Sequence, residues 1–331
     1  MGRAAVAVVL VTSWLALFDV RPIAAVARNT TIDPRVQLVA ADAVAAAPLP
    51  TELVAIQPST GDVLAYASHG PGLAADDALV GKYPTGSTFK IITSAALIAH
   101  GLSPQSPATC PGSLTVDGGT LTTYNNLADP TVETLSDAFA RSCDTAFATL
   151  GAQLLTTDYK SAAASFGLGK PLSLGRPAFA GTVANPTSSY DRATLAAYGA
   201  TSVVSPLVLA NVAATVDSGR LRPVRLLTHA TVRGKPHQLD RRVITGLRSM
   251  MAAAVTNGTA TGYGLPADTH AKTGTARFAN TPSPQTTYAW LIGYRTDLAF
   301  AVLVLGGTQG GPAAGPIAAR FLTALPPTPA Q

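Results

Sequence analysis

The sequence contains few charged residues. Asp, Glu, Lys and Arg make up 12% of its 331 residues, and lysine occurs only six times. The formal net charge is +5, but the longest basic run is the pair Arg241-Arg242. Nucleic-acid-binding proteins usually cluster Lys and Arg with aromatic residues between them, so the sequence argues against a nucleic-acid partner. A mild attraction of a basic face to an anionic polymer or a membrane surface stays open.

Cysteine and histidine are scarce as well. The five histidines are isolated, and no Cys/His spacing is typical of a metal site. Phosphate-binding and dinucleotide-binding glycine motifs are absent too, so we expect no metal and no other cofactor. The two cysteines, Cys110 and Cys143, either form one disulfide, which would suit an exported protein, or remain free buried thiols.

A charge-free apolar run covers residues 4 to 18, which is short for a membrane span. Pro22 follows it, and Ala25-Val26-Ala27 has the small-x-small pattern that a signal peptidase requires. We interpret residues 1–28 as a signal peptide cleaved after Ala27 or as an uncleaved membrane anchor, with a buried N-terminal helix as a third alternative. Export predicts that residues 29–331 lie outside the cytoplasm.

Short apolar runs predict strands near both ends of this part of the chain. Two strands, at 53–57 and 63–68, flank a turn, and three more follow at 269–278, 286–295 and 298–307. Between them, periodic apolar patterns predict helices at 87–99, 134–154, 159–166, 205–218 and 240–256, and a last helix covers 316–325. Residues 181–191 and 277–285 are rich in Pro, Ser, Thr and Asn and are predicted to be loops.

This order of elements predicts an α+β (α/β/α) fold. Strands from distant segments must meet in one five-stranded antiparallel sheet, flanked by helices, with an all-helical lobe inserted between them. We expect the functional site in a cleft between the sheet and the lobe.

A reactive pair, Ser87 and Lys90, stands at the start of an apolar helix. Residues three apart lie on one helix face, so the hydroxyl and the amine are within hydrogen-bonding reach. A serine nucleophile needs a base, and lysine can serve if its pKa falls from about 10.4 toward 7 or 8. Burial and a second cation can lower it. A single Ser-x-x-Lys also arises by chance about once in such a chain, as a capping Ser and a surface Lys.

A second motif, Lys272-Thr273-Gly274-Thr275, lies on a predicted strand. Lys272 supplies the second cation, and Thr273 and Thr275 offer hydroxyls to a substrate carboxylate. Gly274 lets a substrate backbone approach closely. His270 beside this strand could be a base, but a packed or exposed histidine is the favoured interpretation.

A third motif, Ser142-Cys143-Asp144, places a hydroxyl and a carboxylate two residues apart in the helical lobe. Ser142 could relay a proton between Lys90 and a leaving amine. Cys143 alternates with its two neighbours and should therefore point away from the cleft, which makes it a structural partner for Cys110.

The three motifs occur in the order found in the penicillin-binding, serine-active D,D-transpeptidases, and the chain resembles the class B transpeptidase domain of that family. The resemblance covers residues 29 to about 324 and includes the segments 30–37, 54–68, 203–219 and 289–295. It implies the β-lactamase/transpeptidase-like fold.

The resemblance also implies a role for each motif residue. Ser87 would be the acyl-accepting nucleophile and Lys90 its general base, with Ser142 as proton shuttle and Asp144 beside it. Lys272 would be the electrostatic partner, and Thr273, Gly274 and Thr275 would bind the substrate. The backbone N–H groups of Ser87 and Thr275 would form the oxyanion hole, where one donor is typically worth about 10²- to 10³-fold in rate.

The activity implied is peptidoglycan cross-linking in a bacterial envelope. A D-Ala-D-Ala stem peptide would acylate Ser87, an amine of a neighbouring stem would resolve the acyl-enzyme, and β-lactams would be trapped as covalent inhibitors. Two alternatives, a D,D-carboxypeptidase and a weak β-lactamase, use water in place of the amine. A third, of another class, is a non-catalytic penicillin-binding sensor or cell-wall-binding module.

Two features depart from the family pattern. Asp144 stands where the family usually has Asn, and an additional carboxylate near Lys90 would favour its charged form. In addition, class B enzymes usually carry a pedestal domain before the segment that resembles 30–37. We therefore expect either a minimal transpeptidase domain or a missing upstream portion.

Overall fold

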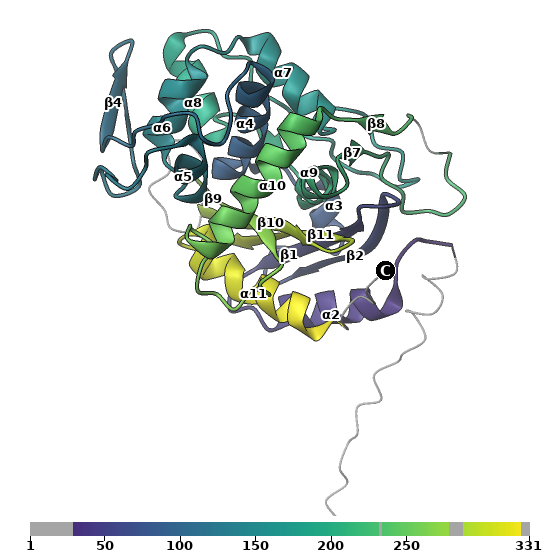
Figure 1. Cartoon of the computed structure of the whole chain (residues 1–331). Helices are drawn as coiled ribbons and strands as arrows, with labels where there is room; N and C mark the ends of the chain where they lie inside the picture. The colour runs from purple at the N-terminus through teal and green to yellow at the C-terminus, as the bar shows by residue number, and fades with distance from the viewer. Residues whose placement is uncertain (1–28, 232–233, 278–286, 326–331) are drawn as a thin grey trace, which may run out of the picture.

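A five-stranded antiparallel sheet is the framework of the protein (Figure 1). The computed structural model describes residues 29–231, 234–277 and 287–325. The strands lie in the order β2-β1-β11-β10-β9, with bounds β1 Thr51–Gln57, β2 Asp62–His69, β9 His270–Arg277, β10 Thr287–Arg295 and β11 Leu298–Leu305. The N-terminal strands join the C-terminal ones through β1, which pairs with β11 so that Thr51 lies opposite Val304. The predicted sheet of distant segments is therefore confirmed.

The two faces of the sheet bury different partners. Leu53 and Ala55 of β1 point toward α2 (Pro34–Ala45) and α11 (Gly310–Ala324), which lie together under one face (Figure 1). Val54 and Ile56 point to the opposite face and join the core of the helical lobe. Burial on both faces explains why β1 is a nearly continuous apolar run instead of an alternating one.

The helical lobe covers the second face. Its helices are α4 (Lys90–Ala99), α5 (Leu135–Ala140), α6 (Asp144–Gly151), α7 (Thr156–Ser165), α8 (Ser189–Tyr198), α9 (Pro206–Ser218) and α10 (Arg241–Thr256). The central one, α9, packs on the sheet and is buried from Pro206 to Val216. Ser205 caps its start and Gly219, in the left-handed conformation, ends it, so the helix predicted at 205–218 is confirmed apart from its first residue.

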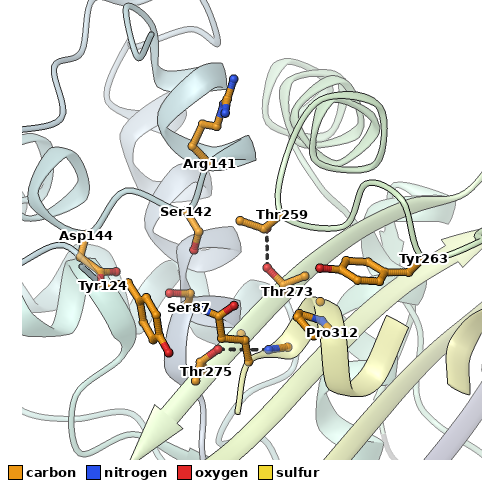
Figure 2. A pocket seen from close by; sticks show the side chains of 14 residues that line it. Ser87, Tyr124, Arg141, Ser142, Asp144, Thr259, Tyr263, Thr273, Thr275 and Pro312 are labelled. Carbon is orange, nitrogen blue, oxygen red and sulfur yellow. Dashed lines mark hydrogen bonds between the residues drawn. The ribbon is translucent and has the colours of Figure 1, made fainter. Parts of the chain in front are cut away.

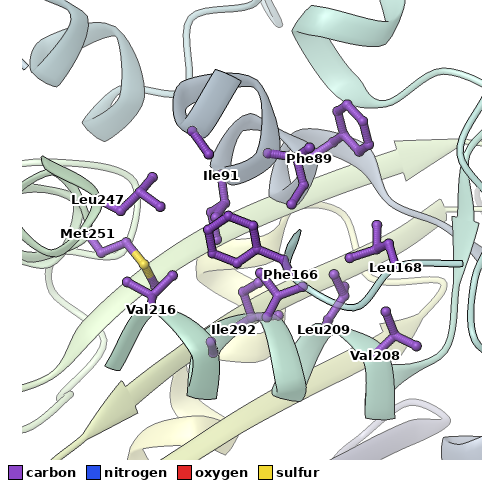
Figure 3. Close-up of a cluster of buried hydrophobic side chains, with 14 of the residues drawn as sticks. Phe89, Ile91, Phe166, Leu168, Val208, Leu209, Val216, Leu247, Met251 and Ile292 are labelled. Carbon is purple, nitrogen blue, oxygen red and sulfur yellow. The ribbon is translucent and has the colours of Figure 1, made fainter. Parts of the chain in front are cut away.

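The core between lobe and sheet is apolar and holds α4, the helix that follows Ser87, in place. Ile91 of α4, Phe166, Leu209 of α9 and Ile292 of β10 converge there (Figure 3). Each such buried side chain contributes about 1.5 to 3 kcal/mol of transfer free energy. The floor of the predicted site is therefore supported by this packed core.

Short elements complete the described part of the chain. They are α3 (Asp77–Val80), β3 (Tyr83–Pro84), the 3₁₀ helix η1 (Gly86–Phe89), β4 (Ser113–Val116), β5 (Gly119–Thr122), β6 (Val203–Val204), β7 (Arg220–Leu221) and β8 (His237–Gln238). β3 pairs with β6, and β4 with β5 makes a hairpin at the edge of the lobe (Figure 1).

Several predicted boundaries were wrong. The helix predicted at 134–154 is two helices, α5 and α6, because Ser142 has a left-handed backbone with φ 59°. The predicted loop at 181–191 ends early, since Ser188 and Asp191 form a capping box that starts α8. The last helix starts at Gly310 and contains Pro316.

Two predicted segments fall largely outside the described residues. These are the loop at 277–285, apart from the end of β9, and the export segment at 1–28. Among the helices that the structure does describe, none has the length and apolar character needed to cross a bilayer.

Candidate active site

Ser87 is presented by η1, directly before α4. The preceding Gly86 has φ +54°, and a Cβ atom there would lie 2.6 Å from the carbonyl oxygen of Thr275. Glycine is therefore required for η1 to approach strand β9 this closely. This contact brings Ser87 next to Thr275, the two residues predicted to form the oxyanion hole.

Lys90 lies in hydrogen-bonding distance of Ser87. Its Nζ is 2.8 Å from Ser87 Oγ and 2.6 Å from Asp144 Oδ1, and the Lys90 side chain is fully buried. Burial lowers the pKa of Lys90, and the charge and hydrogen bond of Asp144 oppose this shift. The predicted Ser–Lys pair is thus formed, and the carboxylate that could hold Lys90 in its charged form is in direct contact.

Lys272 and Ser142 form a second pair. Lys272 Nζ donates to Ser142 Oγ at 2.9 Å and to the carbonyl oxygen of Thr273 at 2.9 Å. Lys272 is fully buried, and burial followed by repulsion from Lys90 holds the pKa of Lys272 well below its usual range. Sequence reasoning expected the second cation to lower the pKa of Lys90. Burial accounts for the lowering at Lys90, and the repulsion acts on Lys272, which has no hydrogen-bonded carboxylate.

The four side chains meet beneath a cleft of about 540 Å³. Ser87, Ser142 and Asp144 line its lobe side, and Thr273 to Thr275 line its sheet side (Figure 2). The Thr273 hydroxyl is 2.5 Å from that of Thr259, and Thr275 Oγ1 accepts a hydrogen bond from the backbone N–H of Gly310 at 3.2 Å. These contacts orient the two hydroxyls predicted to bind a carboxylate.

The break between α5 and α6 positions Ser142 and Asp144. Cys143 is buried behind them and forms a disulfide with Cys110. The left-handed Ser142 turns its hydroxyl toward Lys272, and Asp144 opens α6 next to Lys90. A continuous helix, as predicted, would point these side chains in other directions.

Sequence reasoning missed several residues that line the cleft. They are Tyr124, Arg141, Thr259, Tyr263, Gln309, Gly310, Gly311 and Pro312. Most lie in connections without a recognisable motif, and only Arg141, beside Ser142, had a neighbour that could have drawn attention. Arg141 is the one exposed basic side chain among the described residues of the lining.

His270 is packed and not part of the cleft lining. Its ring stacks on Tyr294 with centroids 4.7 Å apart, and burial lowers the pKa of His270. The described residues also contain no group of three or more His, Cys, Asp or Glu side chains that could hold a metal ion.

Comparison with known proteins identifies the family. Residues 52–323 match the model of the penicillin binding protein transpeptidase domain. The chain is 32% identical to the peptidoglycan D,D-transpeptidase PbpA of Mycolicibacterium smegmatis, covering 89% of this chain and 72% of that protein. It is 29% identical, with the same coverage, to PbpA of Mycobacterium tuberculosis.

Solved structures agree. Penicillin-binding protein A from M. tuberculosis, as its penicillin G acyl-enzyme complex, matches with a TM-score of 0.77 and 27% identity over 89% of this chain and 79% of that one. The transpeptidase domain of penicillin-binding protein 3 from Burkholderia pseudomallei has the same fold, with a TM-score of 0.76 at 21% identity over 90% and 95% of the two chains. The chain therefore belongs to the penicillin-binding protein transpeptidase domain family.

Proposed function

We propose that the protein is a peptidoglycan D,D-transpeptidase that forms an acyl-enzyme at Ser87. The observation that carries the proposal is the buried Lys90 amine 2.8 Å from Ser87 Oγ, at the base of a cleft that contains the second pair, Lys272 and Ser142. The two relatives named peptidoglycan D,D-transpeptidase PbpA support the proposal.

In the first half-reaction, Ser87 Oγ attacks the carbonyl carbon of the penultimate D-Ala. Lys90, uncharged, takes the hydroxyl proton, and the backbone N–H groups of Ser87 and Thr275 stabilise the oxyanion. As the C–N bond breaks, the leaving D-Ala amine takes this proton from Lys90 through the Ser142 hydroxyl, which leaves Lys90 neutral. Lys272 holds this hydroxyl by its hydrogen bond at 2.9 Å. Thr273 and Thr275 bind the terminal carboxylate.

In the second half-reaction, an amine of a neighbouring stem peptide attacks the ester and gives up a proton to the neutral Lys90. Lys90 passes this proton to Ser87 Oγ as the ester C–O bond breaks, and a cross-linking amide replaces the ester. A β-lactam acylates the same serine, but its amine stays attached after ring opening, so the acyl-enzyme persists. We place this chemistry on the outer face of the cytoplasmic membrane or in the secreted state, with residues 1–28 as anchor or cleaved signal.

Labelling with a fluorescent penicillin tests the nucleophile. We expect one label per chain, lost in Ser87→Ala. Ser94→Ala is the matched control, because Ser94 lies on α4 with a buried hydroxyl that is not part of the cleft lining. Labelling that survives in Ser87→Ala would refute the assignment, and an unlabelled wild-type chain would favour a non-acylated wall-binding module.

Incubation with a D-Ala-D-Ala stem peptide and an amine acceptor separates the enzymatic alternatives. We expect release of D-Ala together with the amine adduct, measured by mass spectrometry. D-Ala release without adduct would assign a D,D-carboxypeptidase, and rapid loss of the penicillin label would assign a β-lactamase. Stable labelling without turnover of stem peptide would assign a sensor.

A further inference from the structure

A buried carboxyl group, that of Glu52, contacts Tyr83, which lies four residues before Ser87. Glu52 of β1 is fully buried on the lobe side of the sheet. The Tyr83 hydroxyl donates a hydrogen bond to Glu52 Oε1, while Oε2 has no hydrogen-bond partner in the described part of the chain. A buried carboxylate normally has a cation or several N–H donors. Glu52 therefore calls for an explanation that packing does not give.

The groups around Glu52 favour its neutral form. Tyr83 of β3 faces it, with Asp77 of α3 and Tyr288 of β10 close by. None of the salt bridges found among the described residues involves Glu52. Burial raises the pKa of Glu52 to about 8, the hydrogen bond from Tyr83 opposes the rise, and the charge of Asp77 adds to it. Near neutral pH the side chain is thus mainly a carboxylic acid.

Tyr83 links this carboxyl to the segment 83–87, which ends at the proposed nucleophile Ser87. Its ring packs against Tyr288 and edge-on against Trp290, with centroids 5.6 and 6.3 Å apart. The Trp290 indole donates to the carbonyl oxygen of Pro84 at 3.0 Å. Only Thr85 and Gly86 separate Pro84 from Ser87. The Trp290 side chain therefore contacts both residues of β3.

The same row of residues reaches the opposite side of Ser87. Across the sheet, Glu52 pairs with Leu303, Leu303 with Trp290, and Trp290 with Gly274. A Cβ atom at Gly274 would lie 2.7 Å from Thr88 Cγ2, so β9 closely approaches the residue after Ser87. A shift of Tyr83 has little space to relax before it reaches the nucleophile.

We infer that the neutral carboxyl group of Glu52 positions Ser87 through Tyr83 and Pro84, and that loss of its proton at alkaline pH shifts this segment. The inference rests on the proposed acylation at Ser87. An ionised Glu52 would keep the Tyr83 hydroxyl as its one donor, but it would have no cation and would be repelled by the charge of Asp77, so water must enter beside Oε2. Because Glu52 is fully buried, this water needs space that a movement of β3 opens.

The experiment follows activity and structure together. The sequence has two tryptophans, so Trp14→Phe in the full chain leaves Trp290 as the only fluorescent indole. We would measure the acylation rate constant with a fluorescent penicillin and the Trp290 emission from pH 6 to 9.5. We expect both to change with a shared midpoint near pH 8, with about a tenfold loss of rate, and we expect no such change in Glu52→Gln.

Two further variants make the test specific. Asp77→Asn removes the charge that raises the pKa of Glu52, so the shared midpoint should move to lower pH. Tyr83→Phe should lower the maximal acylation rate at pH 7 about tenfold without weakening the initial binding of penicillin, because a positioning residue acts on the chemical step. A change in initial binding alone would contradict a positioning role.

The outcomes separate this inference from the proposed function. If the wild-type chain is never acylated, the proposed function fails, and the Trp290 titration of wild type and Glu52→Gln still decides whether Glu52 holds the segment. If acylation occurs but its pH dependence and the Trp290 emission are the same in Glu52→Gln, the inference is overturned. If Glu52→Gln does not fold, an unmoved midpoint in Asp77→Asn overturns it and a lowered midpoint supports it.

Discussion

Fully buried ionisable side chains lie at two places beside the segment 83–87, which ends at Ser87, and the two places differ in how charge is compensated. On the cleft side, Lys90 has Asp144 at 2.6 Å and its neighbour Lys272 has only neutral oxygens. On the sheet side, Glu52 has one tyrosine and no cation. Burial shifts the pKa of every one of these groups toward the neutral form. Asp144 opposes the shift at both lysines, through its charge and a hydrogen bond at Lys90 and through its charge alone at Lys272. The comparison teaches that a single oppositely charged partner determines how far burial moves the pKa of an ionisable side chain.

The largest effect should follow removal of the base. We expect Lys90→Met to lower the rate of acylation by about 10³-fold, within the range for general base catalysis. Lys82→Met, on the exposed Lys82 near the same segment, is the control and should retain the wild-type rate. Acylation within tenfold of wild type in folded Lys90→Met would contradict the assignment of the base.

Next in size is the loss of the Ser142 hydroxyl. Ser142→Ala and Ser142→Gly both remove the acceptor for Lys272 and should lower acylation by about 10- to 100-fold. Because Ser142 has φ 59°, Ala adds backbone strain of about 1 kcal/mol that Gly avoids, so thermal unfolding should rank Gly above Ala. If activity followed stability instead of the hydroxyl, Ser142 would be a structural residue only.

Replacing the carboxylate at Lys90 tests the comparison directly. Asp144 raises the pKa of Lys90, so Asp144→Asn should lower that pKa further and increase the neutral fraction at pH 7. The acid limb of the acylation rate should therefore move to lower pH, with a rate about 3- to 10-fold higher at pH 7. Asp42→Asn, exposed on α2 at the far face of the sheet, should leave the limb in place. A limb that moves to higher pH would exclude this role for Asp144.

Glu52 should affect stability with the opposite sign from an ordinary carboxylate. Its folded pKa of about 8 exceeds the unfolded value near 4.5, so the folded state holds a proton that the unfolded state releases between these pH values. Its contribution is full below pH 4.5 and falls by up to about 1.4 kcal/mol per pH unit toward pH 8. Urea unfolding at several pH values should show a flatter dependence in Glu52→Gln, and parallel curves would show that Glu52 is not protonated in the folded protein.

The smallest effect on chemistry should come from the disulfide. Intact mass after alkylation in denaturant should show two additional alkyl groups only when reductant is present. Reduction should lower the free energy of unfolding by about 4 kcal/mol in the chain-entropy model, without removing penicillin labelling. Two thiols that alkylate without reductant would show that Cys110 and Cys143 are not joined in the protein.

Much of this architecture could be predicted because its patterns are local. The sheet strands, the Pro206 and Gly219 ends of α9 and the three motifs are visible as periodicity, capping residues and spacing. The break at Ser142 could not be seen, since a left-handed serine depends on contacts with Lys272 and on a cysteine pair that are distant in sequence. Glu52 was missed for a related reason. In sequence it is a polar residue in a strand, and only the paired sheet shows that it is buried without a cation.

The central claim is that burial lowers the pKa of the Lys90 amine beside Ser87 below its ordinary value. The chain has six lysines, so a titration of ¹³Cε-labelled lysine by NMR can resolve each of them, with Lys90→Arg and Lys272→Arg providing the assignments. We predict that Lys90 and Lys272 titrate below the ordinary value of 10.5, with Lys272 the lower of the two and its midpoint rising when Lys90→Met removes the repulsion. Midpoints at or above 10.5 for Lys90 would contradict the account.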